Sequence, residues 1–252
     1  MTSPAPSPAT PSAPASPAGL ELAAVTASYG ASLALRDVSM QVPKSSVVAL
    51  LGANGAGKTT TMKVASGLLR ARSGTVLING VDINDVPSYK RARRGLCLIP
   101  EGRGIFRSLT VRENLDLQIP PWAAGHDISV AIDNFPILGK RLGQVAGSLS
   151  GGQQQMLALC RAFLSQASVV LVDELSLGLA PVVVDVIFES LAALRNKGVA
   201  LLIVEQYVSR ALAMADHVYL LNRGGITWSG PAAELDEQTL GASYLGQADE
   251  VF

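Results

Sequence analysis

The chain has 252 residues, of which 48% are hydrophobic, and this is enough for one or two domains with a sizeable core. Its 20 Lys and Arg residues balance 20 Asp and Glu residues, so the composition does not indicate a broad nucleic-acid-binding surface. The mean hydropathy is +0.32, but no apolar run approaches the length of about 18 residues that a membrane span requires. Cys97 and Cys160 stand among apolar neighbours, outside any metal-binding or redox spacing, which predicts buried thiols in a reducing compartment.

The first 18 residues consist of Pro, Ala, Ser and Thr after Met1, a composition that cannot form a packed core. We predict a disordered tail over residues 1–18, serving either as a start-site extension or as a tether. The tail has neither the basic residues nor the apolar run of a secretory signal. Order is expected from Gly19.

Three strands are predicted before the first functional motif. Residues 20–29 and 34–42 have strand-like patterns, and the uninterrupted apolar run 47–51 predicts a buried strand. Tyr29 ends the first of these strands. Two interpretations of Tyr29 are open at this point: an ordinary aromatic at a strand end, or a ring that stacks on adenine.

The stretch 52–60 matches the pattern G-x-x-x-x-G-K-[ST] through Gly52, Gly57, Lys58 and Thr59. It lies between a buried strand and the first turns of a helix, which is the context of a phosphate-binding P-loop; the alternative is a glycine-rich turn with a chance Lys-Thr pair. Glycines let consecutive N–H groups turn towards phosphate oxygens, and the helix adds the positive end of its dipole. Lys58 is predicted to reach the β- and γ-phosphates, and the Thr59 hydroxyl to ligate Mg²⁺. The predicted nucleotide-binding residues are Gly52, Ala53, Asn54, Gly55, Ala56, Gly57, Lys58, Thr59 and Thr60.

Two more strands and a basic segment lead up to residue 100. Residues 74–80 and 95–100 read as strands, and the second ends at the stretch Pro100-Glu101-Gly102-Arg103. Between them, residues 87–94 form a helical turn with four basic side chains. A charge run of this kind usually indicates a solvated face, so all four are expected to face water.

From about residue 109 to 149 the pattern changes to apolar positions at helical spacing, which predicts an inserted, mostly helical subdomain. Thr110, followed by Glu113 three residues later, predicts a capping box. The segment ends in Leu-Ser-Gly-Gly-Gln, residues 149–153, which opens a helix to about Leu164. A second helix start suited to anions is expected there, with Ser150 as N-cap, and its candidate residues are Ser150, Gly151, Gly152 and Gln153.

The stretch 168–174 consists of Ser168, the four apolar residues 169–172, and then Asp173 and Glu174. Such a run is typical of a central parallel strand, and ligands bind at the carboxyl ends of strands in open α/β sheets. Asp173 is predicted to hold Mg²⁺ through water, and Glu174 to orient and deprotonate the attacking water. The alternative is a pair of solvated acids at a strand end.

The remaining chain continues the alternation of helices and strands. Pro181 is expected to begin a helix, and residues 198–204 form a buried strand that ends at Glu205-Gln206. A helix to Ala215 and a strand over 216–221 follow, and Gly224-Gly225 predicts a hairpin into residues 226–229.

In this order and spacing, the P-loop, LSGGQ and the apolar run that ends in Asp-Glu resemble the ATP-binding cassette of ABC transporters, over residues 20 to about 247. LSGGQ is the distinguishing motif, because other P-loop NTPases lack it. The resemblance implies an α/β P-loop NTPase fold in one ATP-binding domain, residues 19–247. It implies a RecA-like core over 19–100 and 165–247, an antiparallel β subdomain and an α-helical subdomain over about 105–160.

The resemblance also implies a head-to-tail dimer with ATP held between the chains. The 150–153 stretch of one chain would close over the ATP held by the P-loop of the other. Tyr29 falls where the family stacks an aromatic ring on adenine, which favours that interpretation. Residues 176–179 fall at the loop that signals across the dimer.

Two departures from the family pattern make the sequence resemble one subgroup of the family more than the others. Glu101 stands where the family usually has Gln, and Gln206 where it usually has His. Both, together with the stretches 109–115 and 177–181, look like the second ATPase subunit of branched-chain amino acid importers. Leu175 stands where many members have Pro, and no function is assigned to that difference.

The same departures affect the expected chemistry. Gln206 can hydrogen-bond a γ-phosphate or the attacking water, but it lacks the charge of a protonated histidine, a loss of about 1–3 kcal/mol if that charge matters. We hypothesise that Glu101 contributes to Mg²⁺ coordination or to coupling with a membrane partner; alternatively, it pairs with Arg103. Lys58, Glu174 and Gln206 are thus the predicted catalytic residues, and Thr59, Asp173 and Glu101 the predicted metal-binding residues.

The resemblance implies ATP and Mg²⁺ as cofactors and a place at the cytoplasmic face of the cell membrane. The implied partners are a second ATPase subunit in a homo- or heterodimer, transmembrane permease subunits and, indirectly, a solute-binding protein, with no nucleic acid. Three alternatives stay open: an importer ATPase for urea, amides or another small polar solute, a non-transport ATPase that acts on DNA or the ribosome, and a catalytically silent regulator. The intact Lys58, Asp173 and Glu174 argue against the last of these.

Overall fold

The computed structural model describes residues 18–241 apart from residues 124, 126, 206–207 and 237. The predicted tail lies outside the described residues except for Ala18, which begins the first strand one residue before the expected start of order.

In the described part of the chain, ten strands form two sheets. The smaller sheet contains β1 (Ala18–Tyr29), β2 (Ser32–Pro43), β4 (Ser73–Ile78) and β5 (Val81–Asp82), and it is antiparallel in the order β2-β1-β4-β5. The larger sheet contains β3 (Val47–Leu51), β6 (Leu96–Ile99), β7 (Val169–Asp173), β8 (Ala200–Val204), β9 (His217–Asn222) and β10 (Gly225–Pro231). Its order is β10-β9-β3-β8-β7-β6, and every neighbouring pair is parallel except β10 and β9.

The six-stranded sheet separates two hydrophobic cores. In β3, Val47, Ala49 and Leu51 belong to one cluster of buried side chains, whereas Val48 and Leu50 belong to the other. Successive side chains of a strand point to opposite faces, so a strand between two cores must be apolar at every position. This is why the central strands have continuous apolar runs in the sequence.

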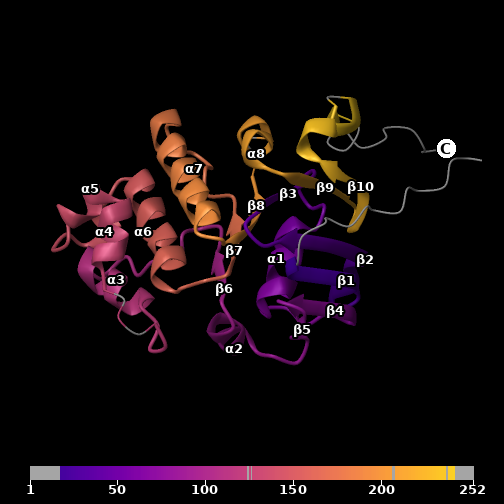
Figure 1. The fold of residues 1–252 in the computed structure, drawn as a ribbon, viewed down its shortest axis with the longest axis horizontal. Coiled ribbons are helices and arrows are strands. Elements are labelled where there is room, and N and C mark those ends of the chain that lie inside the picture. The colour runs from indigo at the N-terminus through magenta and orange to yellow at the C-terminus, as the bar shows by residue number, and fades with distance from the viewer. Residues whose placement is uncertain (1–17, 124, 126, 206–207, 237, 242–252) are drawn as a thin grey trace, which may run out of the picture.

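Helices cover the sheets and form one end of the molecule. α1 (Lys58–Ser66) packs into the core between the two sheets through residues such as Met62 and Val64. The other core is completed by α6 (Gly151–Leu164), α7 (Pro181–Asn196) and α8 (Val208–Met214). The short elements are α2 (Ser88–Arg93), α3 (Val111–Gln118), α4 (Ser129–Asn134), α5 (Pro136–Gly139), η1 (Ala146–Ser148) and η2 (Ala232–Glu234). Figure 1 shows α3 to α6 at the end of the molecule opposite the antiparallel sheet.

The α/β architecture predicted from the sequence is confirmed. The predicted capping box on α3 is present, because Thr110 Oγ1 accepts from the N–H of Glu113 and the Glu113 carboxylate accepts from the N–H of Thr110. The short strand β5 was not predicted. It pairs with β4, and both of its residues are exposed. A strand of two residues is too short for an alternation of apolar and polar residues to indicate it in the sequence.

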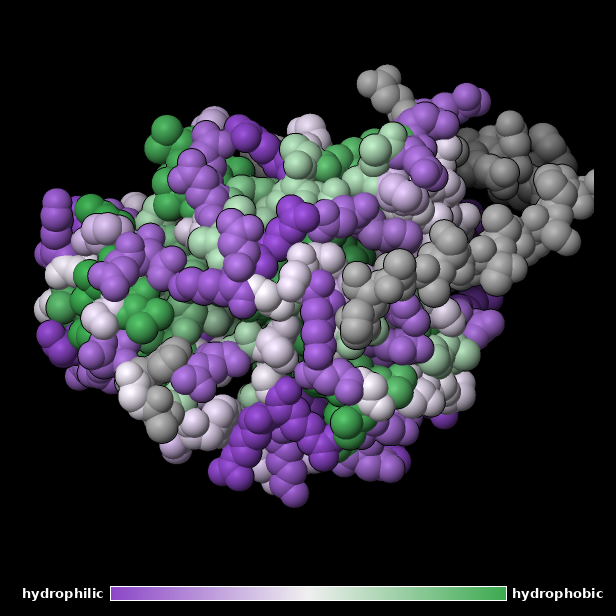
Figure 2. Space-filling model, viewed as in Figure 1, coloured by the Kyte–Doolittle hydropathy of each residue, from purple (hydrophilic) through white to green (hydrophobic). Residues whose placement is uncertain are grey.

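One part of the basic segment differs from the prediction. Lys90, Arg93 and Arg94 are exposed as expected, and Figure 2 shows a hydrophilic surface where Figure 1 places α2. Arg91, in contrast, is buried. Its guanidinium donates to the carbonyl oxygens of Val64 and Ala65 at 2.8 Å, and it therefore satisfies carbonyls at the end of α1 that have no donor within the helix.

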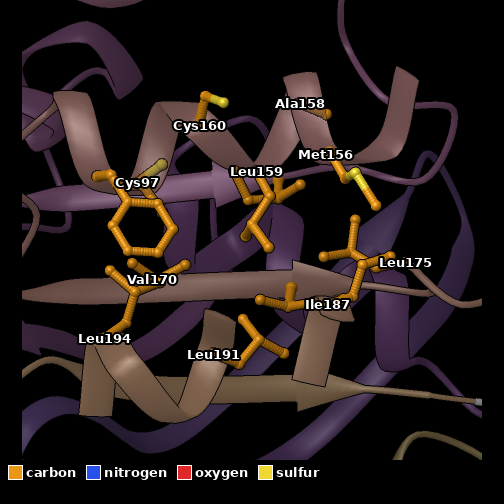
Figure 3. Close-up of a cluster of buried hydrophobic side chains, with 14 of the residues drawn as sticks. Cys97, Met156, Ala158, Leu159, Cys160, Val170, Leu175, Ile187, Leu191 and Leu194 are labelled. Carbon is orange, nitrogen blue, oxygen red and sulfur yellow. The ribbon is translucent and has the colours of Figure 1, made fainter. Parts of the chain in front are cut away.

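The core around α6 contains both cysteines. Cys97 of β6 and Cys160 of α6 belong to this cluster of buried side chains, and Figure 3 shows Cys97 on the side of α6 that faces Val170 and Cys160 on the other side. Both are free thiols and buried, as predicted. Burial raises the pKa of Cys97 to about 11 and raises that of Cys160 further, so neither is a reactive thiolate at neutral pH. Within the described part of the chain, no helix has the length and apolarity needed to cross a bilayer.

Candidate active site

The loop between β3 and α1 has a backbone that requires glycine at two positions. Gly52 has φ +152° and Gly57 has φ +115°, values that residues with a side chain rarely adopt. A Cβ at Gly52 would lie 2.1 Å from the carbonyl oxygen of Leu221, and one at Gly57 would lie 2.9 Å from Leu35 Cδ2. The loop therefore packs closely against neighbouring elements and leaves its other side open.

Lys58 lies inside the curve of this loop. It is 8% exposed, and its ammonium donates to the carbonyl oxygens of Gly52 at 2.8 Å and Ala53 at 3.1 Å. Burial lowers the pKa of Lys58, while the charges of Glu174 and Asp173 raise it. The cation is thus held at the centre of the loop, beside two acids from the end of β7.

The N-terminus of α1 has no side-chain cap, because its N-cap is Gly57. The first N–H groups of a helix have no carbonyl partner within the helix. In α1 these are the N–H groups that follow Lys58 in the P-loop sequence, and together with the helix dipole they make an anion-binding position.

A cavity of about 380 Å³ opens over this loop. It combines P-loop residues with two carboxylates from other parts of the chain, Glu101 after β6 and Glu174 after β7. The structure thus brings together residues far apart in the sequence at the carboxyl ends of parallel strands, where open α/β sheets bind ligands. The lining residues are Ala34, Asn54, Gly55, Gly57, Lys58, Thr59, Thr60, Glu101, Glu174 and Leu177.

Asp173, at the end of β7, is 3% exposed and its Oδ1 atom has no hydrogen-bond partner. Burial raises its pKa to about 6, a hydrogen bond with the Thr59 side chain opposes the rise, and the charges of Glu174 and Glu101 add to it. A buried, partly unsatisfied carboxylate near other acids is a position that a cation would stabilise. Among the described residues, however, no three His, Cys, Asp or Glu side chains are placed to hold a metal by themselves. A metal here would also need the Thr59 hydroxyl and oxygens from the ligand.

Glu174 has a left-handed backbone conformation, with φ +50°. Its N–H donates to the carbonyl oxygen of Val204 in β8 at 2.9 Å. The chain therefore turns sharply after β7 and presents the Glu174 side chain to the cavity.

Glu101 and Arg103 do not pair, although such a pair was one of the predicted alternatives for Glu101. The described residues contain no ion pair between them, and Arg103 donates instead to Gln154 Oε1 on α6. Arg161 of α6 also donates to the carbonyl oxygen of Gly104 at 2.8 Å. The loop that carries Glu101 is thus bound to the helix that begins with the LSGGQ motif.

That helix begins differently from α1. Ser150 Oγ accepts from the N–H of Gln153 at 3.3 Å, and Gln153 Oε1 accepts from the N–H of Ser150 at 3.2 Å. This is a capping box, with Ser150 as the predicted N-cap. None of residues 150–153 lines the cavity of its own chain.

Two predicted site residues are not placed with this cluster by the described structure, one because it is not among the cavity residues and one because it is not described. Tyr29 is 47% exposed at the end of β1, is not among the cavity residues, and has the Lys63 ammonium 5.7 Å from its ring centroid. Gln206 lies outside the described residues. Ala34 lines the cavity without having been predicted as a site residue, because a single Ala in a strand pattern carries no signal.

Comparison with known proteins agrees with this geometry. The family model described as ABC transporter matches residues 35–176. The high-affinity branched-chain amino acid transport ATP-binding protein BraG of Pseudomonas aeruginosa is 41% identical over 227 residues, which cover 88% of this chain and 97% of that protein. The probable branched-chain amino acid transport ATP-binding protein LivF of Archaeoglobus fulgidus is 37% identical over 207 residues, covering 81% and 88%.

The fold agrees as well. A solved structure of the ATP-binding subunit of an ABC transporter superimposes with a TM-score of 0.76 and 30% identity, covering 89% of this chain and 95% of the other. The α/β P-loop fold implied by the sequence motifs is therefore confirmed. The chain belongs to the ABC transporter family, and it is an ABC ATPase.

Proposed function

We propose that this chain is the ATP-hydrolysing subunit that powers an ABC importer for branched-chain amino acids. The observation that carries the ATPase part is the convergence of Lys58, Thr59, Glu101 and Glu174 on one cavity over an uncapped helix N-terminus. The cargo is supported by two relatives, at 41% and 37% identity, whose names state branched-chain amino acid transport.

The P-loop binds the triphosphate. Lys58 exchanges its two carbonyl partners for β- and γ-phosphate oxygens, and the N–H groups at the start of α1 bind the phosphates from below. Tyr29 stacks on the adenine ring, and its exposed face is available for this contact.

The residues that would hold Mg²⁺ are Thr59 through its hydroxyl, Asp173 through water and Glu101 as a further ligand, and phosphate oxygens of ATP would complete the set. The fit rests on the unsatisfied Oδ1 of Asp173 and on the repulsion among Asp173, Glu174 and Glu101. When bound, the ion offsets negative charge on the phosphates.

Glu174 orients the attacking water and accepts its proton, because its carboxylate faces the same cavity as Lys58. Gln206 contributes a neutral hydrogen bond on the γ-phosphate side, where it cannot supply charge. Water attacks the γ-phosphorus, the bond to the β-γ bridging oxygen breaks, and ADP and phosphate leave.

A second ATPase subunit, identical or different, completes the site. Residues 150–153 of one chain close over the ATP of the other, which agrees with their absence from the cavity of their own chain. ATP binding closes this dimer, hydrolysis reopens it, and permease subunits at the cytoplasmic face of the membrane follow the motion. Residues 105–160 act as the helical subdomain in contact with those subunits.

The test is transport by a reconstituted complex of this chain, the permease subunits that co-purify with it and their solute-binding protein, in liposomes. Leucine, isoleucine and valine should each stimulate ATP turnover and enter the vesicles, whereas urea and acetamide should not. Uptake of urea or an amide instead would overturn the cargo and leave the ATPase assignment intact.

The Glu174→Gln variant tests hydrolysis separately, since it keeps the size of the side chain but removes the base. It should still bind Mg·ATP and should lose turnover by about 10²-fold or more. Turnover that is equal in this variant and the wild type would remove Glu174 from the mechanism.

A further inference from the structure

A buried carboxylate outside the predicted site touches the loop that follows Glu174. Glu205, directly after β8, is 2% exposed, and Ser176 is fully buried. The N–H of Ser176 donates to Glu205 Oε1 at 3.2 Å, and its hydroxyl donates to Glu205 Oε2. Both oxygens of one carboxylate thus hold both donors of one residue.

The turn between β7 and Ser176 is bound at each of its residues. The N–H of Glu174 donates to Val204, the neighbour of Glu205, at 2.9 Å. The carbonyl oxygen of Leu175 accepts from Gln155 Nε2 of α6 at 2.8 Å, and the Leu175 side chain is buried. Ser176 is bound by Glu205. Only the Glu174 side chain in this turn lines the cavity.

The conformation of Glu174 explains why the turn needs these bonds. A residue other than glycine at φ +50° is strained by about 1–3 kcal/mol, and such a conformation persists only where the surroundings impose it. The hydrogen bond of Glu174 to Val204 fixes one side of the turn, and the pair Ser176–Glu205 fixes the other. If either side is released, the backbone can relax and turn the Glu174 carboxylate away from the cavity.

We propose that Glu205 is a positioning residue for hydrolysis, which acts through Ser176 to hold Glu174 in its reactive orientation. The inference rests on the proposed role of Glu174 in deprotonating water. Glu205 itself is not among the residues that line the cavity, so its effect on catalysis is indirect. An ionised carboxylate accepts from both donors of Ser176. The amide of Gln can accept from only one of them, and its nitrogen would have to donate to the Ser176 hydroxyl, which reverses the second bond and leaves the hydroxyl proton without this acceptor.

The test compares Glu205→Gln with Glu189→Gln in the full-length chain assembled with its permease subunits. Glu189 is exposed on α7 and serves as the matched control. Because a displacement of about 1 Å costs a reacting group about 10²-fold, we expect kcat for ATP to fall by about 10²-fold in Glu205→Gln. KM for Mg·ATP should stay within about twofold in both variants, since the P-loop contacts are unchanged.

Substitutions at Ser176 test whether the effect passes through this contact. Ser176→Ala removes the hydroxyl donor and should lower kcat by about tenfold, whereas Ser176→Thr keeps both donors and should retain most of the activity. The double variant Ser176→Ala with Glu205→Gln should be no slower than Glu205→Gln alone, because the two side chains form one unit. The Ser176 variants keep the proposal testable if Glu205→Gln does not fold.

Three results would overturn the proposal. These are an unchanged kcat in Glu205→Gln, a fall in Mg·ATP affinity as large as the fall in kcat, and losses that add in the double variant. The Glu174→Gln variant separates this failure from failure of the proposed function. If Glu174→Gln abolishes turnover but Glu205→Gln does not change it, only the positioning role is wrong; if neither substitution has an effect, the role of Glu174 fails as well.

Discussion

Two helices of this protein begin with glycine-containing motifs, but their N-termini are built in opposite ways. α1 begins behind Gly57 with no side-chain cap, and its first N–H groups face a cavity that contains Lys58. α6 begins with a capping box in which Ser150 and Gln153 bond each other, and none of residues 150–153 lines the P-loop cavity of its own chain. α3, far from the P-loop in the sequence, has the same type of capping box.

The difference separates two ways of binding one anion. An uncapped helix start leaves donors unsatisfied, so it is suited to a ligand that its own chain binds tightly. A start already satisfied by its own side chains is stable without ligand, so it can approach an anion bound elsewhere. The first arrangement suits binding of ATP by one chain, and the second suits closure over the ATP of another chain.

The largest effect is expected at α1. Lys58→Ala removes the cation that the loop encloses, with a loss of about 3 kcal/mol in charge-assisted hydrogen bonds, or about 10²-fold in affinity. Titration of the isolated chain with a fluorescent ATP analogue measures this. Lys140→Ala, at an exposed position beyond α5, should bind as the wild type does. If Lys58→Ala binds the analogue within about threefold of the wild type, then the start of α1 is not the tight anion-binding position that distinguishes it from the start of α6.

The second effect concerns the other end of α1. Arg91→Met keeps the length of the side chain but removes the guanidinium that donates to the carbonyl oxygens of four residues, Asn84, Val86, Val64 and Ala65. The Val64 carbonyl keeps a bond from the N–H of Gly67, and the others lose their bond from Arg91. We expect a loss of about 3 kcal/mol in the free energy of unfolding, seen as a lower urea midpoint with an unchanged m-value. The exposed neighbour Arg94→Met should change stability by less than about 0.5 kcal/mol. The folded Arg91→Met protein should still bind ATP, because the N-terminus of α1 is untouched.

The third prediction uses the two capping boxes as a matched pair. Ser150→Ala and Thr110→Ala each remove one N-cap, and each should lower stability by about 1 kcal/mol. Only Ser150→Ala should lower ATP turnover of the assembled complex, by about tenfold, because in the proposed dimer only Ser150 approaches the ATP of the other chain. Equal turnover in the two variants would assign Ser150 a structural role alone.

Local patterns were sufficient to predict much of the fold. The continuous apolar run before the P-loop predicted β3, and Thr110 with Glu113 predicted the start of α3. In these cases the determining interactions lie within a few residues of one another, so the sequence shows them. The spacing from Gly52 to Thr59 likewise placed Lys58 within a loop at a helix start.

Interactions between distant segments were missed for the opposite reason. Arg91 lies in a basic run that looks solvated, and only the packing of α2 against the end of α1 shows that it is buried. Glu205 follows a strand as an ordinary acid would, and its partner Ser176 is 29 positions away in the chain. No periodicity or spacing in the sequence connects such residues. The contacts of Arg91 and Glu205 that stabilise the elements around the site could therefore be identified only from the structure.

The smallest expected effect is the pH dependence of stability that Asp173, beside the start of α1, should cause. The pKa of Asp173 is about 6 in the folded chain, above its ordinary value of 3.8, because burial disfavours the ionised form. The folded state therefore binds the proton more tightly than the unfolded state does. The contribution of Asp173 to stability is present below pH 3.8 and is lost as the pH rises through about 6.

The test is the melting temperature of the nucleotide-free chain and of Asp173→Asn between pH 5 and pH 7. The wild type should lose about 2–4 °C relative to the variant over this range, since the amide does not titrate and other carboxylates cancel in the difference. Mg·ATP should abolish this relative loss, because a bound cation favours the ionised carboxylate. The acids Glu101 and Glu174 line the cavity over α1, whereas residues 150–153 at the start of α6 do not line it. Ser150→Ala should therefore leave the pH dependence of the melting temperature unchanged. If wild type and Asp173→Asn respond identically to pH, the buried acid at the end of β7 is not the group that distinguishes the two helix starts.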